Sequence, residues 1–423
     1  MKLPLALSSC CAIAYAVSAA AAGAYRDTTD HAAYVIKFNP AYNASSAHAF
    51  LASKHNEFMV SMASGGDVSY QAADTNTPIL MDSIHMGDSF FTMTGALDDQ
   101  FVQLLHQDDA IEFIESDNVY KTTLTRSMPV EKRSIHYKAV SPNWGLARIR
   151  QRELNDLSIY DYADDEGHGV DVFVLDSGVH VEHPDFEGRA FTSSNFVQEE
   201  EDTDFAGHGT HVAGKVAGKV YGVAKAANIQ SVKILNKTGD GKLSTMLKGL
   251  SHVVQAATPG KAVVNLSLSG PPSRVMNAAI RSLVQEHNIP VFVSAGNAGA
   301  DACNFSPSSS PDVFVIGATD ITDRVASYSN TGPCVSMYAP GTDIVSTWIG
   351  GGEHGNVKSL DGTSMASPHV VGIAASLLSR QSFESPKQLY SLLTELGTKN
   401  VIAFPDSSAG PENNIMAYIT AEE

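Results

Sequence analysis

The sequence has few cysteines and few cations, and each shortage limits what the protein can be. Cys10 and Cys11 lie in the first residues, which leaves only Cys303 and Cys334 for the rest of the 423-residue chain. Two cysteines in an oxidising compartment suggest one disulfide, and the alternative is two buried thiols. Because 28 Lys and Arg stand against 46 Asp and Glu, the formal net charge is −18. We therefore expect no nucleic-acid partner.

Long apolar runs are missing beyond the first residues. Lys2 precedes the apolar run 3–16, and small residues follow through Ala24. This pattern is typical of a secretory signal peptide, so we expect residues 1–24 to be removed. No later run is long enough to span a membrane, and no membrane partner is expected. The predicted location is extracellular, with the vacuole as the alternative.

Residues 33–120 are predicted to form a small α+β unit. The expected order is a strand at 34–38, a helix at 46–62, a strand at 90–93, a helix opening at Asp98-Asp99 and a strand at 111–114. This β-α-β-α-β order favours a ferredoxin-like sandwich with one sheet face covered. Periodicity then fades from 120 to 143, which indicates a linker. The dibasic pair Lys132-Arg133 within it predicts processing after Arg133, so that the mature chain starts at Ser134. The alternative is self-cleavage somewhere between Tyr120 and Asn143.

The chain after Asn143 alternates apolar strands with helices. Strands are expected at 170–175, 229–235, 262–268, 291–294 and 313–316, and helices at 211–220, 244–254 and 275–286. A last helix is expected to begin at Thr363 and Ser364, with Pro368 in about its first turn. This alternation predicts an α/β domain: a mainly parallel sheet with helices on both faces. In such sheets the chemistry lies at the carboxyl ends of the strands.

Four glycine-flanked polar motifs stand at strand ends or helix starts. Asp176 ends a strand, His208 lies in a glycine-rich turn, Asn297 follows a strand, and Ser364 opens a helix. A serine hydroxyl becomes a nucleophile when an imidazole takes its proton, and a buried carboxylate holds the imidazole in the correct tautomer. An amide and the N–H groups of a helix start can receive the oxyanion. The four residues together predict nucleophilic acyl transfer.

Each of these residues also has a simpler interpretation. Ser364 alone would be a helix cap, Asp176 and Asn297 could be turn residues, and His208 could be structural. His208 and His211 are spaced like metal ligands. However, no glutamate lies between them and no cysteine is near, so we expect no catalytic metal.

The motifs resemble those of the subtilisin-like serine peptidases, in the proteinase K and cerevisin branch. The resemblance starts at Trp144-Gly145-Leu146-Ala147-Arg148-Ile149 and covers most of the chain after it. It implies Ser364 as nucleophile, His208 as general base and acid, Asp176 as its orienting carboxylate, and the Asn297 amide with the Ser364 N–H as oxyanion hole. It also implies that residues 25–133 are a propeptide that acts as folding template and inhibitor, and that residues 134–423 are the catalytic domain.

The resemblance further implies where a peptide substrate would bind. An extended peptide would add to two edges, one formed by Gly239, Gly241 and Leu243 and the other by Ser267, Leu268 and Ser269. One of its side chains would enter a pocket between residues 267–269, residues 294–297, which include Gly296, and Phe305. The uncharged pocket walls favour apolar or aromatic side chains before the scissile bond. Ser269 stands where the family has glycine, which narrows this preference.

Other family features are expected to differ in this chain. Cys303–Cys334 matches a disulfide of the relatives. The family's calcium site near Pro311 and Val313 has Ser336 in place of an aspartate, so calcium binding should be weak or absent. Val212 replaces a cysteine found in several relatives, which should lower sensitivity to thiol reagents.

Glycosylation sequons stand at Asn43, Asn236, Asn265 and Asn304, with Asn265 expected to be buried and unmodified. Together the features predict a monomeric zymogen of a serine endopeptidase with protein and peptide substrates. The alternative is a catalytically silent binding protein on the same scaffold.

Overall fold

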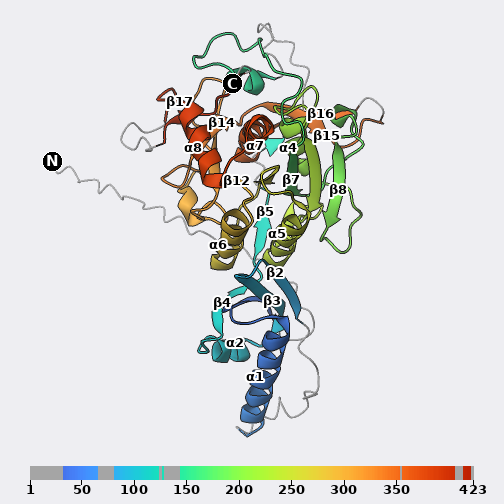
Figure 1. The fold of residues 1–423 in the computed structure, drawn as a ribbon, viewed down its shortest axis with the longest axis vertical. Helices are drawn as coiled ribbons and strands as arrows, with labels where there is room; N and C mark the ends of the chain where they lie inside the picture. The colour runs from blue at the N-terminus through green and yellow to red at the C-terminus, as the bar shows by residue number, and fades with distance from the viewer. Residues whose placement is uncertain are drawn as a thin grey trace, which may run out of the picture.

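The computed structural model describes residues 32–64, 81–122, 126–127, 143–352, 355–404 and 413–420. In this part of the chain a small N-terminal unit lies below a larger one (Figure 1). The expected signal peptide and the pair Lys132-Arg133 lie outside the described residues. No helix among the described residues is both long and apolar enough to pass through a bilayer.

The small unit is a four-stranded antiparallel sheet with two helices on one face. Its elements are β1 (Ala32–Phe38), α1 (Ala44–Ser64), β2 (Asp82–Met86), β3 (Phe90–Leu97), α2 (Asp99–Leu105) and β4 (Ile111–Ser116). The strand order β2-β3-β1-β4 is that of a ferredoxin-like sandwich. The sequence-based expectation lacked β2, whose exposed and buried residues alternate over only part of its length. The core between sheet and helices includes Phe38, Phe91 and Phe101.

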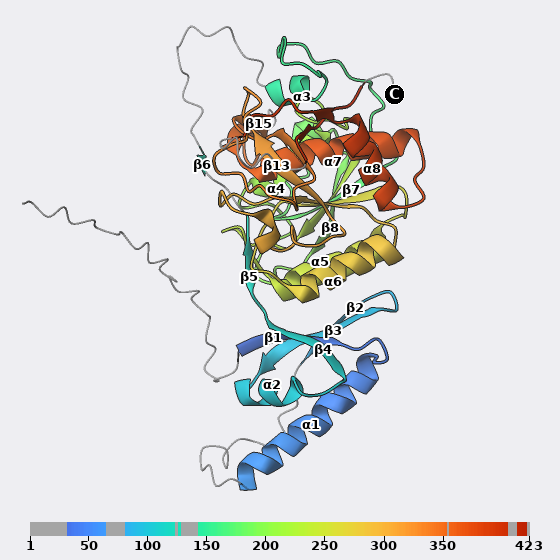
Figure 2. The same ribbon diagram turned by 90° about the vertical axis from the view of Figure 1, so that its left-hand side faces the viewer.

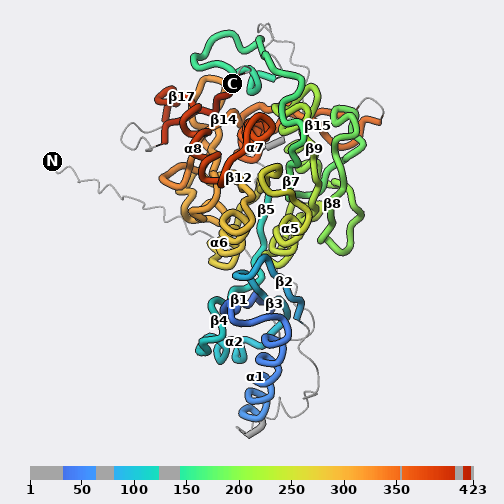
Figure 3. The backbone as a smooth tube through the Cα atoms, viewed as in Figure 1, coloured from blue at the N-terminus to red at the C-terminus, as the bar shows by residue number. Residues whose placement is uncertain are grey.

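The large unit contains a nine-stranded sheet in the order β17-β18-β14-β13-β12-β11-β7-β9-β8. From β18 to β8 each neighbouring pair is parallel. The strands are β7 (Asp171–Asp176), β8 (Ala190–Asn195), β9 (Asn228–Lys233), β11 (Ala262–Leu266), β12 (Val291–Ser294), β13 (Phe314–Thr319), β14 (Met337–Pro340), β17 (Thr398–Lys399) and β18 (Ile415–Met416). The backbone path in Figure 3 shows this sheet between two groups of helices.

Helices cover both faces of this sheet, as expected. They are α3 (Trp144–Arg148), α4 (His208–Ala217), α5 (Leu243–Ala256), α6 (Arg274–Arg281), α7 (Thr363–Arg380) and α8 (Pro386–Leu396). Short helical turns lie at Pro184–Phe186, Ser282–Glu286 and Ala302–Asn304. In the side view, α5 and α6 form the side of the large unit that faces the sheet of the small unit (Figure 2). The α/β architecture is therefore confirmed.

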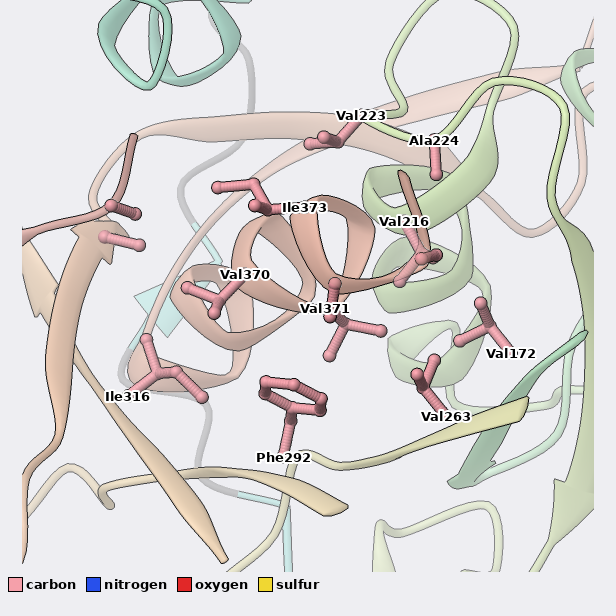
Figure 4. Close-up of a cluster of buried hydrophobic side chains, with 14 of the residues drawn as sticks. Val172, Val216, Val223, Ala224, Val263, Phe292, Ile316, Val370, Val371 and Ile373 are labelled. Atoms are coloured by element: carbon pink, nitrogen blue, oxygen red, sulfur yellow. The ribbon is translucent and has the colours of Figure 1, made fainter. Parts of the chain in front are cut away.

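Helix α7 runs through the core and positions the polar residue at its start. Val370, Val371 and Ile373 pack among Phe292, Ile316 and side chains of α4 (Figure 4). Pro368 lies in the second turn of α7, one turn later than predicted. Because proline has no N–H to bond four residues back, the Ser364 carbonyl is left without its helical donor. The Ser267 hydroxyl donates to that carbonyl instead, at 3.3 Å.

Two expectations about local structure were wrong. Helix α4 begins at His208, three residues before the predicted start, because the Asp204 side chain accepts from backbone N–H groups of its first turn. The stretch after Tyr120 is not a plain linker, since β5 (Val119–Lys121) and β6 (Arg126–Ser127) add to the large unit. Their partners are β10 (Asp240–Lys242) and β16 (Asn356–Asp361), and β16 also pairs with β15 (Ile344–Trp348).

Candidate active site

Asp176 and His208 form a buried pair between the end of β7 and the start of α4. The His208 Nδ1 lies 2.8 Å from Asp176 Oδ1 and 2.9 Å from Oδ2. Both side chains are completely buried. The Ser177 N–H donates to Asp176 Oδ1 at 2.7 Å, which leaves the carboxylate well satisfied. A carboxylate at Nδ1 fixes the tautomer with the proton on Nδ1 and a lone pair on Nε2.

The Asp204 carboxylate ties the two halves of this pair together, a role that the sequence-based reasoning missed. It accepts from the N–H of Gly207 at 2.8 Å and from the N–H and hydroxyl of Thr210 at 2.9 and 2.7 Å. It also accepts from the Ser177 hydroxyl at 2.8 Å. Burial raises its pKa despite these donors. One carboxylate therefore joins the strand end that carries Asp176 to the helix start that carries His208.

Ser364 lies at the start of α7, completely buried in this structure. Its hydroxyl donates to the Ser267 carbonyl at 3.2 Å. The His208 Nε2 is buried and has no hydrogen-bond partner among the residues that the structure describes. The expected bond from serine to imidazole is thus not formed here. Such bonds are often absent or long until a substrate is bound, so Ser364 remains a candidate nucleophile.

The orientation of the Asn297 amide follows from its contacts. Its Oδ1 accepts from the N–H of Thr363 at 2.9 Å and from the Thr363 hydroxyl at 2.7 Å. The Thr363 hydroxyl in turn accepts from the Gly296 N–H at 3.1 Å. Because the oxygen is held on this side, the amide NH₂ points the other way. The side chain is thereby fixed as a donor beside the start of α7.

The two predicted substrate edges are occupied by a segment of the chain itself. Strand β5 pairs antiparallel with β10, with Tyr120 opposite Gly241. On the other side, the N–H of Lys121 donates to the Ser269 carbonyl and the Ser269 N–H donates back, both at 3.1 Å. The Thr122 N–H donates to the Gly239 carbonyl and the Leu243 N–H to the Asn118 carbonyl, both at 2.8 Å. Residues 118–122 therefore bind as an added central strand.

The side chain of Tyr120 fills a pocket that the sequence did not reveal. Tyr120 is completely buried in a cluster with Leu243, Met246 and Leu268 of the large unit. Its hydroxyl donates to the Pro271 carbonyl at 3.2 Å. A Cβ at Gly270 would lie 2.5 Å from the tyrosine ring, so this glycine is needed for the ring to fit. No local pattern marks such a pocket, because it exists only between β10 and the residues after β11.

The remaining predicted pocket residues lie beside this segment. Gly296 has φ +99°, and a Cβ there would come within 2.5 Å of the Asn330 amide nitrogen and 3.5 Å of the Ser269 hydroxyl. The Ser269 hydroxyl therefore lies next to Gly296, another residue of the predicted pocket. Phe305 is half-buried, and Ser267 contacts both the hydroxyl and the carbonyl of Ser364.

His211 does not join His208 in a metal site. Its Nε2 lies 3.0 Å from both the Ile344 and the Lys358 carbonyls. Burial lowers the pKa of His211 to about 3, so the ring is neutral and donates to carbonyl oxygen. Within the described residues no group of three or more His, Cys, Asp or Glu side chains is arranged to hold a metal ion.

The disulfide and the sequons can be located. Cys303 and Cys334 form a disulfide with a Cα–Cα distance of 5.4 Å, as the resemblance implied. Asn43 and Asn304 are exposed and Asn236 is partly exposed. Asn265 is completely buried, with its amide donating to the Ser267 hydroxyl at 3.0 Å.

We expect calcium chelation to leave the stability of the protein unchanged. Ser336, which the resemblance places at the expected calcium site, accepts from the Val315 N–H at 3.1 Å and carries no charge. The cavity of about 500 Å³ beside it is lined by one carboxylate, Glu395, and by two lysines, Lys387 and Lys399, and this excess of positive charge disfavours a divalent cation. Thermal unfolding with and without excess EDTA tests this. A fall of several degrees in Tm, restored by calcium, would contradict it.

Comparison with known proteins agrees with this geometry. Residues 167–410, more than half of the chain, match the family model "Subtilase family". "Subtilisin-like protease 2" of Pseudogymnoascus destructans is 41% identical over 65% of this chain and 67% of its own length. "Subtilisin-like serine protease Pen c 2" of Penicillium citrinum is 36% identical over 76% of this chain and 73% of its own.

A solved structure supports the same assignment. The crystal structure of "a cold adapted subtilisin-like serine proteinase" is similar with a TM-score of 0.60 at 38% identity, over 65% of this chain and 97% of the other. The family match, the level of identity and the shared fold agree, so the chain belongs to the subtilase family of subtilisin-like serine proteases.

Proposed function

We propose that this protein is a secreted or vacuolar serine endopeptidase that acts through an acyl-enzyme. Ser364 attacks the scissile carbonyl, and His208 Nε2 takes its proton and later gives it to the leaving amine. Asp176 stabilises the imidazolium, and the Asn297 NH₂ with the Ser364 N–H bind the oxyanion. The observation that carries this proposal is the buried Asp176–His208 pair, with 2.8 and 2.9 Å contacts, next to an occupied substrate cleft.

We further propose that the enzyme is made as a zymogen whose own chain is its first substrate. Strand β5 ends at Lys121 on one side of the site, and β6 begins at Arg126 against Asp361 on the other. We take the bond to be cut to lie between these two paired segments. We place the cut after Thr123, two residues beyond Lys121, which pairs with Ser269.

This assignment differs from processing after Arg133, which lies outside the described residues and remains a prediction. The two cuts are compatible if the self-cleavage comes first and trimming to Ser134 follows. N-terminal sequencing of the early product should read Leu124, and that of the mature form Ser134. An early product that starts at Ser134 would refute the first cut.

The preference for apolar or aromatic residues before the scissile bond is tested separately. Mature enzyme is incubated with a peptide library, and the cut sites are read by mass spectrometry. We expect apolar or aromatic residues before the cut, because the pocket walls carry no charge. A strict preference for Lys or Arg there would contradict this interpretation.

A catalytically silent binding protein is the other function considered. It would keep the occupied cleft but hydrolyse nothing. The His208–Asp176 contact argues against it, since a binding protein has no need for a buried imidazole held in one tautomer. Absence of any hydrolysis by the processed, folded protein would favour the silent alternative.

A further inference from the structure

The loop that carries Asn297 is held from one side by the side chain of Asn330. The Asn330 Nδ2 donates to the Ala295 carbonyl, before Asn297 in the chain, at 2.9 Å. The Asn330 Oδ1 accepts from the N–H groups of Ala298 and Ala300, after Asn297, both at 3.0 Å. One amide therefore binds the backbone on both sides of the residue that is proposed to donate to the oxyanion.

The backbone of Asn330 completes this attachment. Its N–H donates to the Gly296 carbonyl at 2.9 Å, and a Cβ at Gly296 would lie only 2.5 Å from the Asn330 Nδ2. Asn330 is completely buried and is itself held in place. The Ser329 hydroxyl donates to the Asn330 carbonyl at 2.9 Å and accepts from the Ala318 N–H of β13 at 3.0 Å. The loop is thereby tied to the central sheet through residues 329 and 330.

Other links keep the same two segments together without the Asn330 side chain. The Thr331 N–H donates to the Ala300 carbonyl at 3.0 Å. Farther along, the disulfide between Cys303 and Cys334 joins the two segments covalently. Loss of the Asn330 side chain should therefore loosen the loop around Asn297 without detaching it from the domain.

The position of this loop matters because an oxyanion donor must be aimed before the reaction starts. The contacts with Thr363 fix which way the Asn297 amide is turned, but the place from which the side chain projects is set by its backbone. A misplacement of about 1 Å can cost about a hundredfold in rate. The four bonds from Asn330 act on that backbone position.

We propose that Asn330 is a positioning residue of the reaction, which acts through Asn297 by holding the oxyanion loop in place. The inference rests on the proposed peptidase function and adds to it a residue outside the four polar motifs. Its effect is on the transition state, because the two substrate edges at 239–243 and 267–269 are not part of the loop that Asn330 binds.

The test compares four mature enzymes: wild type, Asn297→Ala, Asn330→Ala and the double variant. Each precursor is left to process to completion, as shown by intact mass, and circular dichroism confirms folding. The substrate is a quenched fluorescent peptide with the sequence of residues 118–127. Asn297→Ala should lower kcat by about 10²–10³, as expected for loss of one oxyanion donor. Asn330→Ala should lower kcat about ten- to fiftyfold and change KM less than about threefold.

The double variant distinguishes positioning from a general structural effect. If Asn330 acts through the Asn297 amide, nothing remains to be positioned once that amide is removed. The double variant should therefore match the kcat of Asn297→Ala to within about twofold. Asn330→Ser is the milder substitution if Asn330→Ala does not fold. Its hydroxyl can replace one of the lost contacts, so its kcat should lie between those of wild type and Asn330→Ala, with the same lack of effect in the Asn297→Ala background.

The matched control is Asn414→Ala. The Asn414 side chain also bridges two backbone groups, since it accepts from the Ile402 N–H at 3.0 Å and donates to the Ile402 carbonyl at 2.9 Å. It lies beside β18, three strands away from β12 in the sheet. This variant should leave kcat and KM at their wild-type values.

The outcomes separate this inference from the proposed function. A kcat of the Asn330 variants within twofold of wild type, a loss confined to KM, or an equal further fall in kcat when Asn297 is already alanine would overturn the positioning role while the peptidase assignment stands. A wild-type kcat in Asn297→Ala would refute the oxyanion role of Asn297 itself. If folded wild-type enzyme cuts no peptide, the peptidase assignment fails.

Discussion

Ser364→Ala is expected to lower kcat by about five to six orders of magnitude and to leave the precursor uncut. The proposed mechanism needs the Ser364 hydroxyl to form the acyl bond, so its removal leaves only substrate binding and oxyanion stabilisation to lower the barrier. Because residues 118–122 are bound through backbone contacts, the uncut chain should keep them in the cleft. Intact mass measurement of the purified protein, with residual hydrolysis of a peptide substrate, tests both parts.

The matched control for this variant is Ser391→Ala. Ser391 lies on α8, where its hydroxyl donates only to the Lys387 carbonyl one turn earlier. This variant should process and hydrolyse normally. A Ser364→Ala protein that still matures when expressed in a protease-deficient host would show that another group, or another enzyme, makes the cut.

The largest expected effect on stability comes from Lys215→Met. Lys215 lies two turns after His208 on α4 with only 1% of its surface exposed. Its ammonium makes no hydrogen bond or ion pair with the residues that the structure describes, and burial lowers its pKa to about 7. Burying an unpaired cation is costly, so a methionine of similar length should raise the free energy of unfolding at pH 6 by about 1–3 kcal/mol.

The pH dependence of this gain follows from the pKa. In the unfolded chain Lys215 titrates near 10.5, and in the folded protein near 7. Between these values the unfolded state binds more protons, so stability rises with pH and is lost as pH falls toward 7. The advantage of Lys215→Met should therefore be full below pH 7 and vanish above about 10.5. His211, with its pKa lowered to about 3, adds a further loss of stability as pH falls below about 6.5.

The stability gain is measured by denaturant unfolding at pH 6, 8 and 10, with Lys215→Met introduced into Ser364→Ala protein. The inactive background prevents self-digestion. Lys219→Met is the control, because the Lys219 side chain is 51% exposed and should change stability little at any pH. If Lys215→Met destabilises the protein, or if its effect is the same at pH 6 and pH 10, then the lysine has a partner that compensates its burial.

The sequence was sufficient to predict the fold class, since apolar strands alternating with helices led to the parallel sheet. Asp176 at the end of β7 and His208 at the start of α4 come into contact, as expected. The disulfide was implied only by resemblance to a family. Ser364 was placed correctly at a helix start, but the direction of its hydroxyl depends on Ser267, which directly follows the distant strand β11.

What sequence could not show are features formed between distant segments. Strands β5 and β6 have three and two residues, too few for a periodic signal, and exist only because β10 and β16 offer edges. The start of α4 depends on the side chain of Asp204, four residues upstream of His208. The burial of Lys215 could not be predicted from the sequence either, since a lysine on a helix would ordinarily face water.

The most direct test of the central claim is covalent labelling of the processed protein with a serine-directed fluorophosphonate, followed by peptide mass spectrometry. We expect one adduct, on Ser364, which forms in wild type and is lost in His208→Ala. An unlabelled Ser364 in folded, processed protein, or equal labelling without the imidazole, would contradict it.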